Sequence, residues 1–184
     1  GSKAEMALPD GTFVHLNAAT NLEYDVNNSK QRLVKLSGEA FFDVAKNPDC
    51  PFKVIINDLQ IEVVGTSFNV KTYKKDIVET SLLSGRIRIS GGSLPHEYTL
   101  SPGQKATYSA MDRTLRISKA DAHVEAGWRD NYLIFESTPL IDVIAQIERW
   151  YGVEIRLHHK QIAQDLLSGS FRNESIQNVI RSLS

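Results

Sequence analysis

The feature that most constrains this chain is an alternation of apolar and polar side chains that runs from residue 8 to about residue 117. Such a period of two places one face of an extended strand against a core and leaves the other face polar. Turn-forming pairs such as Asp10-Gly11 and Pro102-Gly103 separate the alternating segments. We therefore expect this part of the chain to form a series of β-strands.

A glycine stands just before each of five alternating segments, at Gly11, Gly38, Gly65, Gly85 and Gly103. We expect each glycine to supply a positive φ angle or a close backbone approach where a strand begins. A repeat of this kind is typical of stacked strand units. The fold predicted for residues 6–120 is therefore a mainly β lobe, either solenoid-like or a sandwich of antiparallel strands.

The pattern changes around Asp121, where the segment KADAHVEAGWRDN (119–131) is polar and rich in small residues and predicts a linker. Tyr132–Phe135 then predicts a strand. The triplet Ser137-Thr138-Pro139 predicts a helix start with a hydroxyl cap, and an apolar stripe follows from Leu140 to Tyr151. Gly152 is expected to end this helix.

After Gly152 we expect a strand at Val153–Leu157, another at Leu167–Phe171, and a second helix capped by Ser175. Residues 127–184 are thus predicted to form a small α+β domain with the order β-α-β-β-α. An amphipathic helix with no strand after it leaves a small sheet incomplete. We therefore expect that one or two further strands belong to this domain and lie beyond the sequence.

Composition and motifs argue against catalysis and against nucleic-acid binding. The 21 basic and 22 acidic residues give a formal net charge of -1, which offers no attraction for phosphate backbones. The sequence holds no glycine-rich phosphate motif and no nucleophile elbow. His158 and His159 would point to opposite faces of an extended segment, and Cys50 has no histidine nearby in the sequence. We predict no enzyme activity, no cofactor and no metal site.

Two tryptophans and the strand edges remain as candidate binding features. Trp150 falls on the apolar stripe and is expected in the core, and Trp128 is expected to pack the two lobes together. Exposed tryptophans would instead suit a carbohydrate-binding module, which is the alternative function. An open strand edge can bind another protein's strand. We expect that edge at Leu167, Ser168, Gly169, Ser170 and Phe171, then at Tyr132–Phe135, with Trp128 and Arg129 setting the orientation of the lobes.

Five stretches, in this order along the chain, resemble conserved signatures of the FecR family of anti-sigma regulators. They are LPDGTFVHLNAATNLEY (8–24), LSGEAFFDVAKNPDCPFKV (36–54), VVGTSFNVKTY (63–73), LSPGQKATY (100–108) and WRDNYLIFESTPLIDVIAQIERWYGVEI (128–155).

The resemblance implies a periplasmic sensor region that belongs to a single-pass inner-membrane protein, with a second lobe similar to the secretin/TonB short N-terminal (STN) fold. It implies that the N-terminal signalling domain of a TonB-dependent outer-membrane transporter is a partner. It also implies that a cytoplasmic segment upstream of Lys3 binds an extracytoplasmic-function sigma factor. No active site is carried over from the family.

Overall fold

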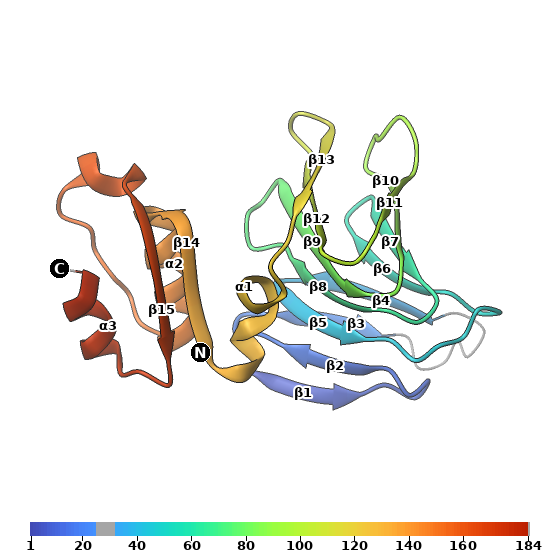
Figure 1. Ribbon diagram of the computed structural model, residues 1–184, viewed down its shortest axis with the longest axis horizontal. Helices are drawn as coiled ribbons and strands as arrows, with labels where there is room; N and C mark the ends of the chain where they lie inside the picture. The colour runs from blue at the N-terminus through green and yellow to red at the C-terminus, as the bar shows by residue number, and fades with distance from the viewer. Residues whose placement is uncertain (25–31, 184) are drawn as a thin grey trace.

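The computed structural model describes residues 1–24 and 32–183, which form a β-sandwich beside a smaller α+β lobe (Figure 1). Within these residues the first sheet has seven strands, paired antiparallel throughout in the order β1-β2-β5-β8-β9-β12-β13. Its strands are β1 (Ala4–Ala7), β2 (Phe13–Leu16), β5 (Glu39–Asp43), β8 (Ser67–Lys71), β9 (Ile77–Ser84), β12 (Gln104–Ser109) and β13 (Thr114–Lys119).

The second sheet has six strands in the described part of the chain, in the order β11-β10-β7-β6-β4-β3. They are β3 (Asn21–Tyr24), β4 (Arg32–Ser37), β6 (Phe52–Ile56), β7 (Leu59–Val63), β10 (Ile87–Gly91) and β11 (Tyr98–Leu100). Successive strands, mostly in pairs, are added alternately to the two sheets. The mainly β lobe is therefore a sandwich, one of the two predicted forms.

One pair of strands departs from the predicted antiparallel arrangement, because β4 and β6 are parallel. The reason is that β5, which separates them in the sequence, lies in the other sheet. The chain leaves the second sheet after β4, crosses to the first, and re-enters the second sheet in the original direction.

The loop that returns the chain from β5 to β6 is held by the buried guanidinium of Arg32 on β4. Arg32 donates hydrogen bonds to the carbonyl oxygens of Cys50 (2.6 Å), Ala45 (2.7 Å) and Asn47 (3.2 Å). Its charge is paired with Asp10 at 3.2 Å. Because one side chain satisfies three carbonyls of an irregular loop, this loop serves the fold of the sandwich.

The core of the sandwich consists of the apolar faces of both sheets. Phe42 on β5 stacks on Phe68 of the same sheet with ring centroids 5.2 Å apart, and it lies 5.8 Å from Phe52 of the facing sheet. All three rings are fully buried. Burial of one such side chain contributes about 1.5–3 kcal/mol, so these rings are a large part of the stability of the lobe.

The predicted role of the repeated glycines is confirmed. Four of the five have a positive φ angle, and the fifth, Gly65, lies so close to Lys46 that a Cβ atom would stand 2.9 Å from its Cα atom. Gly38 combines both demands, with φ of +116° and a hypothetical Cβ only 2.6 Å from the Cα atom of Thr20. A side chain at Gly38 would therefore push β5 away from the loop before β3.

The segment predicted to be a linker is helical. It contains α1 (Ala122–Ala126) and the 3-10 helix η1 (Gly127–Asp130). The side chain of Asp121 accepts a hydrogen bond from the N–H of His123 and caps α1. Ala126 and Trp128 are buried against Phe41, on the face of β5 that points away from the sandwich core. The linker prediction rested on the polar composition of the segment and did not take account of these two apolar residues, whose burial holds the segment on the sheet.

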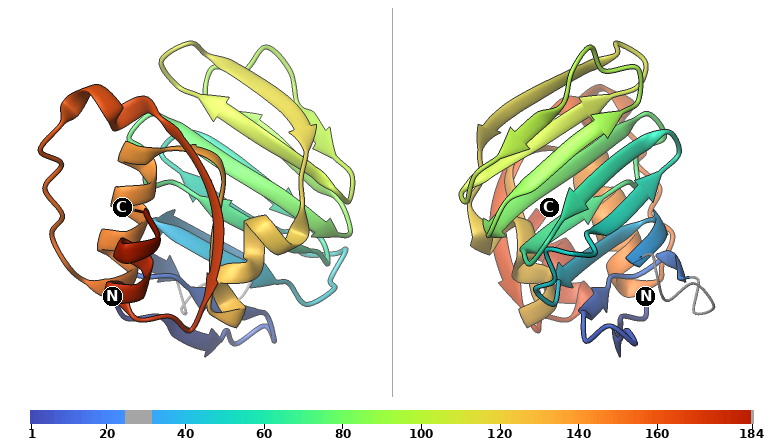
Figure 2. Two further views of the ribbon diagram at one scale, coloured as in Figure 1. Left: turned by 60° about the vertical axis from the view of Figure 1, so that its left-hand side comes forward. Right: turned by 90° about the vertical axis from the view of Figure 1, so that its right-hand side faces the viewer.

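The small lobe follows η1 and lies against the outer face of the first sheet (Figure 2). Its elements are β14 (Tyr132–Pro139), α2 (Leu140–Tyr151), the 3-10 helix η2 (Lys160–Gln164), β15 (Leu166–Arg172) and α3 (Ile176–Leu183). The strands pair antiparallel, and the helices contribute to one core with them. The buried members of that core are Leu133, Phe135, Val143, Ile147 and Val179. The small α+β class of this lobe is as predicted.

The strand predicted at Val153–Leu157 is wrong, because this segment pairs with no strand among the described residues and the observed order of the lobe is β-α-β-α. The N–H of Ile155 donates to the side chain of Glu148 on α2 at 2.8 Å. The side chain of Ile155 packs on the core of the lobe. Alternation thus identified the inward-facing residue, but its backbone donor is satisfied by a helix side chain.

The predicted hydroxyl cap of α2 is also wrong. The N-cap position is Pro139, without a side-chain hydrogen bond, and β14 runs directly into the helix. The hydroxyl of Thr138 instead donates to the carbonyl of Glu136 at 3.2 Å. The predicted end of α2 is confirmed, since Gly152 has φ of 69° and its N–H donates to the carbonyl of Glu148.

The predicted cap of the last helix is confirmed, because the N–H of Asn178 donates to the hydroxyl of Ser175 at 3.3 Å. Ser184, the final residue of the predicted second domain, lies outside the described residues. Independent folding of the predicted domains 6–120 and 127–184 stays a prediction.

Candidate functional site: the lobe junction and an open strand edge

The outer face of the first sheet is polar where the small lobe covers it. Glu39 on β5 stands opposite Lys71 on β8, which stands opposite Glu79 on β9. Because side chains alternate along a strand, these residues share the face of Phe41 and point away from the apolar core. The junction between the lobes is therefore built largely from hydrogen bonds and ion pairs.

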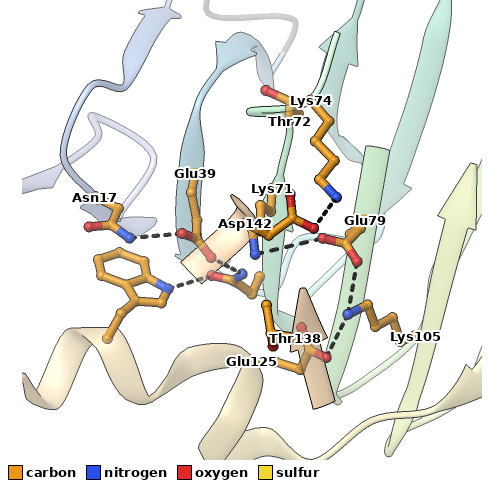
Figure 3. A network of polar contacts seen from close by, with 12 residues as sticks. Asn17, Glu39, Lys71, Thr72, Lys74, Glu79, Lys105, Glu125, Thr138 and Asp142 are labelled. Carbon is orange, nitrogen blue, oxygen red and sulfur yellow. Dashed lines mark hydrogen bonds and ion pairs between the residues drawn. The ribbon is translucent and has the colours of Figure 1, made fainter. Parts of the chain in front are cut away.

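A chain of hydrogen bonds links the sandwich to the junction (Figure 3). The indole N–H of Trp128 donates to the side-chain oxygen of Asn69 at 3.1 Å. The amide group of Asn69 donates to one carboxylate oxygen of Glu39 at 3.0 Å, and Asn17 donates to the other at 2.8 Å. Trp128 is thus placed by both its buried ring and its polar atom, as the prediction that it packs the lobes together requires.

The side chain of Glu39 is buried, with the residue only 7% exposed. This burial raises the pKa of Glu39, while Lys71 and the two amide donors act in the opposite direction. The carboxylate therefore costs free energy at neutral pH, and the amide groups that face it reduce that cost.

A second set of contacts runs from the sandwich to the helices through four charged groups. Lys71 lies 3.8 Å from Glu79, Glu79 lies 3.0 Å from Lys105, and Lys105 lies 2.8 Å from Glu125 on α1. Burial alone would raise the pKa of Glu79, but the two lysines outweigh it and lower the pKa. The alternating signs let each charge neutralise its neighbours at the junction.

Two further contacts join α2 to the sandwich. Lys74 pairs with Asp142 at 2.7 Å, and the guanidinium of Arg149 stands 4.0 Å from the ring centroid of Tyr73. Burial raises the pKa of Tyr73 to about 12, so its hydroxyl stays protonated at physiological pH. These groups border a cleft of about 430 Å³ between the lobes, which also reaches the ion pairs described above.

Arg129 follows Trp128 on η1, and its guanidinium lies over the ring of Phe41 with 3.5 Å to the centroid. Its Nε donates to the carbonyl of Ala126 at 3.2 Å. Burial lowers the pKa of Arg129 from its ordinary high value. Trp128 and Arg129 therefore both pack against Phe41 of β5 from the junction.

The other candidate region is the outer edge of β15. Among the described residues β15 pairs only with β14, and its side chains alternate between exposed and half-buried. Leu167 and Phe171 face the core of the small lobe, whereas Ser168 and Ser170 are exposed. Its backbone donors and acceptors along the outer edge are available to another strand.

The two serines of this edge differ in their roles. A register shift interrupts the pairing of β14 and β15 between Phe135 and Thr138, and there the N–H of Ser137 donates to the hydroxyl of Ser168 at 2.9 Å. Ser168 therefore supports the fold of the lobe. The N–H of Asn173 donates to the carbonyl of Asn131, so the alternation of an antiparallel ladder turns the backbone groups of Ser170 toward the open edge.

The second predicted edge, at Tyr132–Phe135, has a different environment. One side of β14 pairs with β15, and η1 packs against β14 from the junction, where Gly127 approaches Ile134 and Tyr132. Consequently β14 lies between the two groups of predicted site residues. Trp128 and Arg129 lie at the junction, and residues 167–171 lie on the far strand of the small lobe (Figure 1).

Sequence reasoning did not single out several residues of the junction, namely Lys3, Asn17, Asn69, Lys71, Lys105 and Glu125. The one available signal was Asn69, an amide between Phe68 and Val70 in a strand. Glu39 lies on the polar face of its strand, and there it is hydrogen-bonded and buried.

The described residues show no group of three or more potential metal ligands of the His, Cys, Asp and Glu types. His158 and His159 are exposed. Trp128 is buried. Trp150 is partly buried and packs against both the core of the small lobe and the apolar residues around Phe41 at the junction. These two rings are therefore committed to packing, and they offer no sugar-stacking platform. No helix of the described chain is both long enough and apolar enough to cross a membrane.

Comparison with known proteins agrees with the architecture. The model of the family "FecR protein" matches residues 1–88, and the model "FecR, C-terminal" matches residues 132–184. Two crystal structures of a "putative anti-sigma factor" from Parabacteroides distasonis ATCC 8503 are 32% identical in sequence, with TM-scores of 0.90 and 0.89. Each match covers 100% of this chain and 86% of the other. The curated proteins include no match. The chain belongs to the FecR family, a regulatory and non-enzymatic family, and is the sensor region of an anti-sigma factor.

Proposed function

We propose that this region works in the periplasm and receives its signal from the N-terminal signalling domain of a TonB-dependent outer-membrane transporter. The full-length protein would then control an extracytoplasmic-function sigma factor through a cytoplasmic segment. The observation that carries the proposal is the open edge of β15 in the sensor region of an anti-sigma factor. The backbone groups of such an edge can form hydrogen bonds with a strand of a partner protein, which suits a protein that receives its signal through direct contact.

The contact we propose is the addition of a strand of the signalling domain to β15. The backbone groups of Ser170 face the open edge, and added main-chain hydrogen bonds would supply affinity. Leu166, at the start of β15, is 64% exposed and offers an apolar side chain beside the edge. Trp128 and Arg129 lie at the junction, on the other side of the small lobe from β15, and we propose that they hold the small lobe on the sandwich.

The test is a calorimetric titration of this chain with purified signalling domains of TonB-dependent transporters encoded near its gene. We expect saturable one-to-one binding to one of them. Ser170→Pro should weaken that binding by about tenfold or more, because proline removes a backbone donor and blocks close strand approach. Absence of binding to every neighbouring domain, with the chain shown to be folded, would overturn the proposal.

A matched control is Lys119→Pro on β13, an edge strand of the first sheet. The N–H of Ala120 donates to the carbonyl of Gly103, so the backbone of Lys119 also faces an open edge. This variant should bind as tightly as the wild type. If Ser170→Pro binds equally well, the partner uses another surface, although the receiver role would stand.

A further inference from the structure

The N-terminal end of the chain lies against the small lobe, far from it in sequence (Figures 1 and 2). The ammonium group of Lys3 donates to the carbonyl of Trp128 at 2.7 Å and to the side-chain oxygen of Asn131 at 3.0 Å. It also stands 3.6 Å from the ring centroid of Trp150 on α2. One side chain therefore contacts η1, the residue that precedes β14, and a helix of the small lobe.

These three contacts occupy the bonding capacity of the ammonium group. A lysine offers three N–H donors, and here two oxygens and the face of an indole ring receive them. Burial lowers the pKa of Lys3, and Glu39 acts in the opposite direction. The contact is therefore partly desolvated, which makes it stronger than an ordinary surface hydrogen bond.

Lys3 immediately precedes β1, a short strand at one edge of the first sheet. All four residues of β1 are exposed, and in the described structure β1 pairs with β2 alone. The buried core begins only after it, at Leu8. Release of β1 would thus break one short ladder and leave the packed core of the sandwich in place.

We propose that Lys3 is a clamp that couples the position of the small lobe to the pairing of β1, so that displacement of the small lobe releases β1 from β2. The role of such a release in signalling rests on the proposed function, in which a transporter domain acts on the small lobe. The signal would then reach the N-terminal end of the region directly, without rearrangement of the sandwich core.

The contacts that dock α2 provide an independent way to displace the small lobe. Asp142 pairs with Lys74, and Arg149 lies over Tyr73, so both act on the segment after β8. Neither of these contacts involves β1. The double variant Asp142→Asn/Arg149→Gln therefore loosens the docking of α2 without touching the strand whose release is measured.

The test measures hydrogen–deuterium exchange of the β1 amides in four chains: wild type, Lys3→Met, Asp142→Asn/Arg149→Gln, and the combination of all three changes. We expect Lys3→Met to speed β1 exchange by about tenfold, as the loss of a charge-assisted hydrogen bond would. The double variant should also speed it. The combination should exchange little faster than Lys3→Met, because the clamp is already absent and, of the described contacts, only the hydrogen bond from the Gly1 ammonium to the carbonyl of Trp150 still links this end to α2.

The control is Lys53→Met on β6, which removes an ion pair with Glu62 at 3.6 Å on the second sheet. It should leave β1 exchange unchanged. The midpoint of urea denaturation should be nearly the same in all chains, since the sandwich core is retained. Unchanged β1 exchange in Lys3→Met or in the double variant would overturn the clamp, and so would effects that multiply in the combined chain.

Adding the signalling domain separates this inference from the proposed function. The clamp predicts faster β1 exchange in the wild type when the domain is bound. Binding without any change in β1 would overturn the clamp and leave the receiver role intact. Absence of binding would overturn the receiver role, whereas the four-chain measurement would still decide whether the clamp exists.

Discussion

Trp128 has two attachments to the sandwich, and they differ in kind. Its ring is buried with Phe41 and Ala126, while its N–H reaches Asn69. The side-chain oxygen of Asn69 depends in turn on this donor. It is buried, so water could not easily take the place of the Trp128 N–H. A single residue of η1 thus combines apolar burial with the satisfaction of a polar group on β8.

We predict that Trp128→Phe lowers the free energy of unfolding by about 1 to 3 kcal/mol, since it keeps most of the ring and leaves the acceptor of Asn69 unpaired. Urea denaturation followed by circular dichroism measures this loss. The same change at Trp150, which is only partly buried, is the control and should cost less. A loss at Trp128 no greater than that at Trp150 would contradict the importance of the hydrogen bond.

At the scale of residues, the sequence could indicate the face on which a side chain lies but not what covers that face. Glu39 falls on the polar face of its strand, as alternation predicts, and yet it is buried. The cover comes from η1 and the small lobe, which follow much later in the chain. Lys3 gave no signal at all, because its partners at 128, 131 and 150 are set by the docking of the two lobes.

At the scale of elements, alternation located most strands and failed where a strand needs a partner. Leu167–Phe171 was predicted and lies within β15, which has β14 beside it. Val153–Leu157 shows the same apolar spacing but pairs with no strand in the described structure. Periodicity reports which side chains face a core, whereas a ladder also requires a neighbouring backbone. The small lobe supplied a helix side chain there instead.

The glycine at the start of β5 permits a direct test of the element repeat. Gly38→Ala should lower the free energy of unfolding by about 2 kcal/mol or more, because the residue has a positive φ angle and its Cβ would stand 2.6 Å from the Cα atom of Thr20. Gly103→Ala is the control, with φ of +80° and open space around the Cβ position. It should cost about 1 kcal/mol. Denaturation midpoints compare the two, and equal losses would show that the close approach to Thr20 does not matter.

At the scale of the whole molecule, the mainly β and α+β parts were predicted, whereas their mutual arrangement was not. The linker prediction rested on composition, and the structure shows a helical segment packed on β5. The parallel pairing of β4 and β6 also depends on which sheet receives β5. Both are non-local outcomes, and local patterns along the chain carry no information about them.

A chain that ends at residue 120 tests the predicted domain boundary. We expect it to unfold cooperatively, because the core of the sandwich contains only residues from this part. Its free energy of unfolding should fall by about 1.5 to 3 kcal/mol, since Phe41, which is 3% exposed in the whole chain, loses its cover. Urea denaturation measures this. In the shortened chain Phe41→Thr should have little further effect, and a molten or aggregated product would contradict the boundary.

The polar outer face of the first sheet also bears on solubility. A mainly apolar interface between lobes exposes a hydrophobic patch when it opens, and exposed hydrophobic patches promote aggregation. Here the face under the small lobe carries Glu39, Lys71, Glu79 and Lys105, with Phe41 as its main aromatic ring. If the small lobe moved away, water could hydrate these groups at once. Displacement of the small lobe would therefore expose mainly charged groups rather than a large apolar surface.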